Sequence, residues 1–360
     1  MDRTEQLEAL RREAKEIGLF LPVQEDVSPI AGQTVLHGKT LASRAVLLMQ
    51  PVYDADEHGA PTEKTVQRYC DAVRARCCGL VWTEPVAFTP DGRRDPHQLM
   101  LTPENKGKFM SMLYEIRQAA KAAHGTAPVF VLLLDHAARN ALTPVTMEQS
   151  SVLPTEAPVI TDDALLHLIV DCGAAAETAE QAGFEGIALN AADRSLFGES
   201  LAAFHREGMF GGDFDDRTRF VRDCYTAMTV GAKNVFFSIA LTLSDGIPQP
   251  DGWGMAFETE SHPDLYEPAL LTKILRELYG VQLVCCTVGI PGVNWMQAEE
   301  PERESIRVSR LCTCIAMLDS DRQQNVDLIV PQTDAASVPF DCLAAGMIAG
   351  EFASFAGFAG

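Results

Sequence analysis

The segment GIALNAADRSLFGES (186–200) begins as an apolar run and ends in a group of polar side chains. Asn190, Asp193, Arg194 and Ser195 belong to this group. A carboxylate can accept or donate a proton, an arginine can hold an anion, and an asparagine or a serine can donate or accept hydrogen bonds. Because polar residues crowded at the end of a strand are typical of a site, the segment is a candidate for catalysis or binding.

Eight short apolar runs follow one another along the chain, and each is expected to be a strand buried on both faces. The runs are 45–50, 79–84, 129–134, 186–190, 235–241, 283–288, 326–330 and 352–358. Amphipathic stretches typical of helices lie between them, at 62–76, 104–123, 162–182, 215–229 and 267–279. This alternation of strands and helices predicts a closed (β/α)8 barrel, the TIM-barrel fold.

The two ends of the chain depart from a regular barrel. Residues 1–38 contain a charged helical stretch, at about 3–17, and a lead-in, so we expect this segment to be an addition to a barrel formed by residues 39–360. The sequence stops at Gly360, directly after the eighth apolar run, and this predicts a truncated final βα unit.

The composition argues against several classes of partner. The chain has 29 Lys and Arg against 50 Asp and Glu, a net charge of −21, which disfavours nucleic acid and anionic membrane surfaces. The N-terminus is charged, and no apolar run approaches the length of a membrane span, so we expect a cytoplasmic protein. The ten cysteines include no C-x-x-C pair, so we expect buried, reduced thiols and no metal site.

Polar residues at the carboxyl ends of the strands form the site in barrels of this kind. Here these candidates are Gln50, Tyr53, Glu84, Asp135, His136, Arg139, Asn190, Asp193, Arg194, Asp245, Thr287, Asn294 and Gln332. One alternative follows from their chemistry alone. Asp135, His136, Asn190 and Asp193 offer oxygen and nitrogen ligands that could bind a divalent ion, as in a metal-dependent lyase or hydrolase.

Several motifs, from about Lys39 to Gly360, resemble the old yellow enzyme family of NADH:flavin oxidoreductases. The segment at 210–223, FGGDFDDRTRFVRD, is similar to the family's YGGS-x-x-NR-x-RF stretch. The segments WTEPVAFTPDGRRDPHQLMLTPEN (82–105) and LLLDHAARNA (132–141) resemble two further family segments. The resemblance implies a barrel that holds FMN at its top, uses NAD(P)H and reduces activated C=C bonds. We expect Arg217 and Arg219 to fix a long loop through charge-assisted hydrogen bonds.

The positions that the resemblance assigns to the flavin carry different chemistry. Leu133 stands where the family has a glutamine that donates to the pyrimidine edge, and Ala240 stands where it has an arginine near N1. Neither side chain can donate a hydrogen bond or carry a charge. The phosphate end, VPQTDAAS (330–337) and the final GFAG, differs as well. If a flavin binds, the expected contacts are Pro51, Glu84, Arg139 and Gln332.

The catalytic positions also differ from the family. Asn190 and Asp193 stand where the resemblance places the pair that holds the substrate carbonyl, and Ser195 stands at the proton-donor tyrosine. An ionised Asp193 would repel a developing enolate, and serine alone is a poor general acid. The set therefore does not fit the family's chemistry. The catalytic candidates that remain are Asn190, Asp193, Tyr53 and His136.

Two main hypotheses follow from this comparison. In the first, the chain is a flavin-poor or flavin-less member of the family, either a partner subunit or a barrel whose top binds another molecule. In the second, it is an FMN-dependent ene-reductase with a rearranged site, in which His136, Arg139 and Arg194 replace the lost cations and Tyr53 is the acid. NAD(P)H is expected to take part only if flavin is bound.

The last apolar run also bears on assembly. Phe352, Phe355 and Phe358 recur at a spacing of three, whereas strand alternation exposes residues at a spacing of two, so at least one ring should face outward. Large exposed apolar patches are rare on soluble monomers. We therefore expect the N-terminal helix or a second subunit to cover this face. We favour an oligomer of the chain with itself or with a related flavoprotein.

Overall fold

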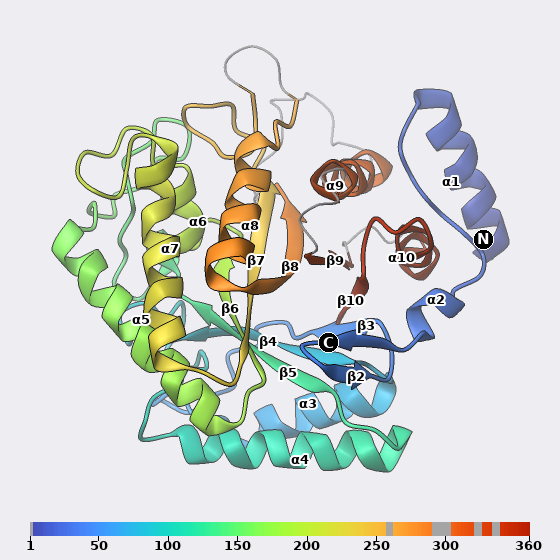
Figure 1. Cartoon of the computed structure of the whole chain (residues 1–360), viewed down its shortest axis with the longest axis horizontal. Coiled ribbons are helices and arrows are strands. Elements are labelled where there is room, and N and C mark those ends of the chain that lie inside the picture. Colours follow the sequence, from blue (N-terminus) through green and yellow to red (C-terminus); the bar gives the residue numbers. More distant parts are fainter. Residues whose placement is uncertain (1–2, 257–261, 290–303, 320–325, 333–338) are drawn as a thin grey trace.

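The computed structural model describes residues 3–256, 262–289, 304–319, 326–332 and 339–360. Eight parallel strands form a closed barrel, in which the last strand pairs with the first. They are β3 (Ala45–Leu48), β4 (Leu80–Ala87), β5 (Val129–Asp135), β6 (Gly186–Ala191), β7 (Phe236–Ser244), β8 (Val281–Val288), β9 (Asp327–Pro331) and β10 (Phe355–Ala359). Each overlaps one of the predicted apolar runs, so the prediction of a (β/α)8 barrel is confirmed (Figure 1).

Helices surround the barrel (Figure 1). The five predicted amphipathic stretches are α3 (Glu63–Ala75), α4 (Lys106–His124), α5 (Asp162–Ala182), α7 (Phe214–Gly231) and α8 (Tyr266–Tyr279). The shorter helices are α2 (Ser28–Ala31), η1 (Ala138–Asn140) and α6 (Leu196–Leu201), and two more barrel helices are α9 (Glu304–Asp319) and α10 (Phe340–Ala349). Most side chains of α10 are buried, and a helix that is apolar all round has no amphipathic pattern to predict it.

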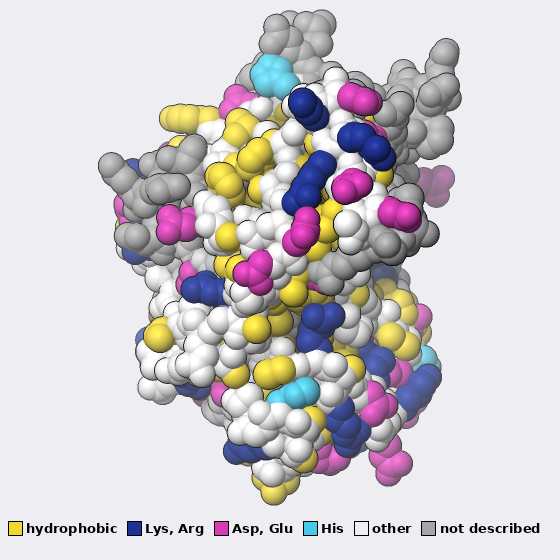
Figure 2. Space-filling model, turned by 90° about the vertical axis from the view of Figure 1, so that its right-hand side faces the viewer, with side chains coloured by type: hydrophobic (Ala, Val, Ile, Leu, Met, Phe, Trp, Pro, Cys, Tyr) yellow, Lys and Arg dark blue, Asp and Glu magenta, His cyan; other side chains and the backbone are white. Residues whose placement is uncertain are grey.

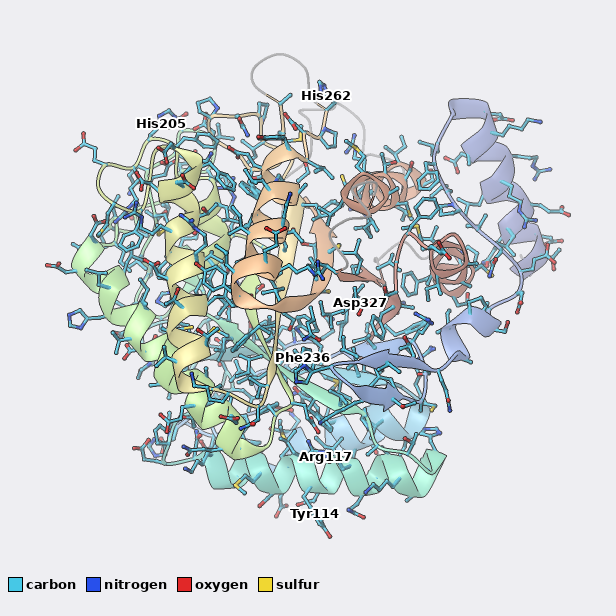
Figure 3. The ribbon with its side chains drawn as sticks, viewed as in Figure 1. Tyr114, Arg117, His205, Phe236, His262 and Asp327 are labelled. Atoms are coloured by element: carbon cyan, nitrogen blue, oxygen red, sulfur yellow. The ribbon has the colours of Figure 1, made fainter. Side chains whose placement is uncertain are left out.

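Side chains that alternate along the strands divide the core into two parts. The outer part lies between the strands and the helices, and the inner part fills the barrel. The ring of Phe236 lies against Gly186 in the barrel interior, because a Cβ at Gly186 would lie 2.5 Å from that ring. Figure 3 shows Phe236 near the centre of the molecule, whereas Tyr114 on α4 points away from it. The barrel is therefore a packed core below its upper end.

A hairpin of two short antiparallel strands, β1 (Thr34–Leu36) and β2 (Lys39–Leu41), joins this inner core. Leu36 and Leu41 belong to the same buried cluster as Phe236, and the hairpin turn residue His37 lies 5.7 Å from the Phe236 ring. The boundary expected between residues 38 and 39 falls inside this hairpin. Both sides of that boundary thus contribute to the barrel interior.

The N-terminal helix α1 (Arg3–Ile17) has the expected bounds and lies beside α9 and α10 (Figure 1). Leu7 and Leu10 are buried, and the Ser305 hydroxyl of α9 donates to the Glu13 carboxylate at 2.7 Å. Figure 2 shows this side of the molecule. In its upper half, acidic and basic side chains are interspersed next to a group of apolar side chains. The helix is attached to the barrel wall through a small apolar contact.

The aromatic residues of the last strand are covered within the chain. Phe355 points into the barrel, and Phe358 packs edge-on against Phe340 of α10 at 5.2 Å. Phe352 packs in the same way against Phe20 of the lead-in, at 5.3 Å. The lead-in and α10 therefore cover these rings. The expectation was that α1 or a second subunit would cover them. The oligomer remains a prediction, and exposed aromatic rings on the last strand no longer argue for it.

Candidate functional site

The candidate site begins where β5 and β6 end. Asp135 is the last residue of β5, and Asn190 lies near the end of β6. Both are buried, and the Asn190 amide donates to the Asp135 carboxylate at 2.8 Å. Burial raises the pKa of Asp135, although this hydrogen bond acts in the opposite direction. The strand ends thus hold a buried carboxyl group of increased basicity.

The upper layer of the barrel interior is slightly more exposed than the layer below it. Leu133, Ala240 and Cys285 are 8%, 6% and 6% exposed. The interior residues two positions earlier on the same strands are fully buried: Val131, Ser238 and Leu283. We refer to Leu133, Asn190, Ala240, Thr242 and Cys285 as the barrel mouth. It combines an apolar floor with a few polar groups, which is the usual composition of a small-molecule site.

The loop after β4 carries an arginine, Arg94, whose charge acts to lower the pKa of Asp135 and of Asp193. This loop is fixed on both sides, because Ala55 donates to the His97 carbonyl at 3.0 Å and Leu142 donates to the Arg93 carbonyl at 2.6 Å. Its Arg94 side chain is exposed and makes no hydrogen bond or ion pair with the residues that the structure describes. Strand-end reasoning misses Arg94 because it lies in a loop; the charged run GRRD was the available signal.

Asp193 is the second charged group at the mouth without a described hydrogen-bond partner. Its side chain is exposed, yet protein surrounds it, and this burial raises its pKa, while the charge of Arg94 opposes the rise. Asp193 and Arg194 both have φ = 53°, and Tyr53 has φ = 56°. Left-handed backbone is costly for residues other than glycine and tends to occur at functional sites. The strain favours a functional role for this rim of the barrel.

Tyr53 lies on the loop after β3, with its side chain half-buried and its hydroxyl free of hydrogen bonds to the described residues. Burial raises its pKa, and Arg94 acts against that change. Next to it, Pro51 is exposed and makes no described polar contact. Tyr53 and Arg94 therefore lie close enough for the charge of Arg94 to act on the Tyr53 hydroxyl.

Glu84 lies behind this loop rather than at the mouth. It is buried and receives a hydrogen bond from Arg68 at 2.5 Å. Arg68 also binds Asp54 through two contacts of 3.1 Å. Burial raises the pKa of Glu84, while the pairing with Arg68 opposes that rise. The geometry gives Glu84 the task of fixing the loop after β3.

The two arginines proposed as replacement cations are paired with carboxylates. Arg139 donates to Glu199 at 2.5 Å and to the Leu153 carbonyl at 2.8 Å. Arg194 donates to the buried Asp245 at 2.5 Å. Buried pairs of this kind are held by geometry, and breaking one leaves a charge without a partner. In the described structure both arginines therefore stabilise loops.

Ser195 and His136 also make local contacts. The Ser195 hydroxyl accepts from the Gly198 amide at 3.2 Å and caps α6. The His136 Nδ1 accepts from the Ala138 amide at 3.2 Å, and a Cβ at Gly92 would lie 2.6 Å from the ring. Burial lowers the pKa of His136 to about 4, so the imidazole is neutral near pH 7. These contacts give both side chains a structural role.

Replacing His136 with glutamine is expected to remove part of the acid sensitivity of folding. The folded pKa of about 4 lies below the ordinary 6.5, so protons favour the unfolded chain and stability is lost as the pH falls from 6.5 toward 4. Between about pH 7.5 and about pH 5 the native chain should lose ~2 kcal/mol more unfolding free energy than His136→Gln. Urea unfolding at both pH values measures this, and equal losses would contradict it.

The phosphate end of the expected cofactor site is only partly described. Gln332 is exposed, and its side chain accepts from the Ala359 amide at 3.2 Å, next to the end of β10. The rest of the segment 330–337 lies mostly outside the described residues, as does Asn294. Thr287 is half-buried, and its hydroxyl lies 3.0 Å from that of Thr242. Gln332 therefore lies beside the end of β10, and its contact with Ala359 does not indicate a role in binding.

At two positions of the barrel mouth, the side chains differ from those that the resemblance assigns to FMN binding. Leu133 and Ala240 both face the barrel mouth, on either side of β6, since Leu133 pairs with Ala188 and Asn190 pairs with Ala240. The Leu133 amide already donates to Thr83 at 3.0 Å. At these two positions the residues present offer the flavin neither a side-chain donor nor a charge. They do not fit FMN as the resemblance would hold it.

Among the described residues, no three His, Cys, Asp or Glu side chains lie close enough to hold a metal ion. Likewise, no helix in the described ranges has the length and apolar character to cross a membrane. Of the ten cysteines, nine are buried, Cys77 is exposed, and none forms a disulfide.

Comparison with solved structures supports the fold. The chain is similar to a 2-naphthoyl-CoA reductase in complex with 2-naphthoyl-CoA, with a TM-score of 0.75 and 13% identity over 93% of this chain and 50% of that one. It is also similar to an old yellow enzyme homologue from Zymomonas mobilis, with a TM-score of 0.68 and 17% identity over 92% of this chain and 88% of the other. The chain has the fold of these proteins, a (β/α)8 barrel.

Comparison of sequences agrees with this resemblance. A 161-residue segment, 42% of this chain, is 26% identical to an NADPH dehydrogenase from Clostridium acetobutylicum. Such matches span about half the length of the curated relatives, 45% and 56%. No family model matches the chain. The resemblance drawn from the motifs is thus confirmed.

Proposed function

We propose that this old-yellow-enzyme-like barrel does not hold FMN in the family's manner and that its mouth binds another small molecule. The observation that carries the proposal is the placement of Leu133 and Ala240. Both are apolar and both face the barrel mouth, at the positions where the resemblance expects a flavin-binding glutamine and arginine. A contact to a charged group contributes about 1.5–3 kcal/mol, so the loss of both weakens flavin binding substantially.

The alternative, an FMN-dependent ene-reductase, needs replacement cations. Arg139 and Arg194 are paired with Glu199 and Asp245, and His136 is buried and neutral. These pairings favour the first function over the alternative. The option of a partner subunit beside a related flavoprotein loses its main argument, because the aromatic residues of β10 are covered within the chain.

The colour of the purified chain tests this proposal. We expect FMN to be absent or substoichiometric, and added FMN to bind more weakly than about micromolar, a binding free energy of about −8.2 kcal/mol. Absorption spectra, mass spectrometry of heat-released ligand and a fluorescence titration with FMN measure these quantities. NADPH should not be consumed by the flavin-free chain. A yellow protein with one tightly held FMN per chain would instead support the ene-reductase.

A further inference from the structure

A shallow hollow lies at the foot of the barrel, at the opposite end of the strands from the barrel mouth. It is lined by the last turns of α3 and α4, which pack side by side, and by the residues that lead into β4 and β5 (Figure 1). The hollow has about 150 Å³ of empty space, part of which is open solvent. Two adjacent cysteines, Cys77 and Cys78, belong to its lining. It is therefore a candidate site separate from the mouth.

The two thiols differ in their access to solvent. Cys77 is exposed, whereas Cys78 is 4% exposed and its thiol makes no hydrogen bond with any residue that the structure describes. Burial raises the pKa of Cys78 to about 12, so this thiol stays protonated near pH 7. Because a thiolate, and not a thiol, attacks a disulfide, Cys77 is the reactive member of the pair and Cys78 is a poor second nucleophile.

The polar side chains beside the two thiols include a cation. The guanidinium carbon of Arg76 lies 3.7 Å from the centre of the Phe358 ring, and Arg76 makes no ion pair with the described residues. His124 donates from Nε2 to the Val73 carbonyl at 3.0 Å, which fixes its ring at the wall of the hollow. No Asp or Glu of the described chain lines the hollow. The charge next to Cys77 is therefore positive, although the whole chain carries a net charge of −21.

We propose that Cys77 is a site of reversible mixed-disulfide formation with small anionic disulfides, such as oxidised glutathione. The Cys77 thiolate attacks one sulfur of the disulfide, a new S–S bond forms to Cys77, and the original S–S bond breaks. The other half leaves as a thiolate and takes up the proton that Cys77 released. Cys77 is thus oxidised and the departing sulfur is reduced, while Arg76 attracts the carboxylates of the incoming disulfide. This reaction does not depend on what the mouth binds.

Mass spectrometry of the intact chain and of its peptides locates the adduct. With oxidised glutathione at about pH 7.5, the native chain should gain one glutathione, on Cys77, and dithiothreitol should remove it. Cys77→Ser should gain none, because the other nine cysteines are buried. Since Cys78 stays protonated, the adduct should persist and not close into a Cys77–Cys78 disulfide. An adduct on another cysteine, or that internal disulfide as the main product, would overturn the proposal.

Three disulfides of different charge test the role of Arg76: oxidised glutathione is anionic, bis(2-hydroxyethyl) disulfide is neutral and cystamine is cationic. The rate with glutathione is divided by the rate with the neutral disulfide, because this ratio cancels changes in folding or in thiol access. Arg76→Met should lower the ratio about two- to fivefold, the effect of one exposed ion pair, and should raise the corresponding ratio for cystamine. Arg12→Met, at an exposed position of α1, is the matched control and should change neither ratio. Ratios that are the same in the native chain and in Arg76→Met would overturn the preference for anions.

Discussion

Arg217→Met should destabilise the fold by about 3–5 kcal/mol, the range measured when one partner of a buried ion pair is removed. The Arg217 side chain is 1% exposed and donates to Glu267 at 2.7 Å and to the Gly212 carbonyl at 3.0 Å. It also donates to the Leu201 carbonyl and lies 3.5 Å from the centre of the Phe204 ring. Methionine fills the volume but leaves these acceptors without a donor. Urea unfolding of both proteins measures the change.

Arg219→Met is the matched control from the same helix. Arg219 is 38% exposed and pairs with Asp216 one turn away, so its loss should cost under about 1 kcal/mol. Glu267→Gln should fall between the two, because Arg217 then keeps its carbonyl acceptors. Similar small effects in Arg217→Met and Arg219→Met would show that the buried arginine does not hold the loop. The motif DRTRF would then need another explanation.

The barrel is predictable because its strands are apolar runs buried on both faces. Two of these predicted runs, 129–134 and 186–190, differ from β5 and β6 by one residue at one end. The helices α9 and α10 lie outside the amphipathic stretches that the sequence predicts. For α10, FDCLAAGMIA, the reason is physical: burial on nearly all sides removes the polar stripe on which such a prediction depends.

The site is predictable only in part. The strand-end rule correctly selects Asp135 and Asn190, because the carboxyl ends of parallel strands meet at one end of the barrel. It cannot predict which cations are free, since Arg139 meets Glu199 across 60 positions of sequence and Arg194 meets Asp245 across 51. Such pairings depend on loop paths that spacing does not reveal. A charge count at the barrel top therefore overstates the cations available to a ligand.

Because these arginines are paired, they cannot readily replace a lost contact to the flavin. In a barrel with unpaired arginines at the mouth, a side chain could swing in and replace a missing cation. Here the pairs of Arg139 and Arg194 would first have to break, and removing a buried partner leaves its carboxylate uncompensated. The Arg94 side chain makes no hydrogen bond or ion pair with the described residues. Arg139 and Arg194 are thus not available to replace a missing flavin cation unless their carboxylate pairs break.

The double variant Leu133→Gln/Ala240→Arg should bind FMN about 100-fold more tightly than the native chain, because two polar contacts of about 1.5 kcal/mol each are restored. Both side chains face the partly exposed mouth, so the new groups can point toward the ligand. Asp193, whose charge acts on the neighbouring Cys285, provides a nearby counter-ion for the introduced arginine. Quenching of FMN fluorescence on titration measures both affinities.

The size-matched variant Leu133→Met/Ala240→Met separates polar contacts from shape. It alters the same positions with flexible apolar side chains, so it should leave FMN affinity within about threefold of the native value, which is under 1 kcal/mol. If the native chain already binds FMN as tightly as the double variant, Leu133 and Ala240 do not limit flavin binding. A gain confined to Leu133→Gln/Ala240→Arg would show that the mouth still has the shape of a flavin site and lacks only its donors.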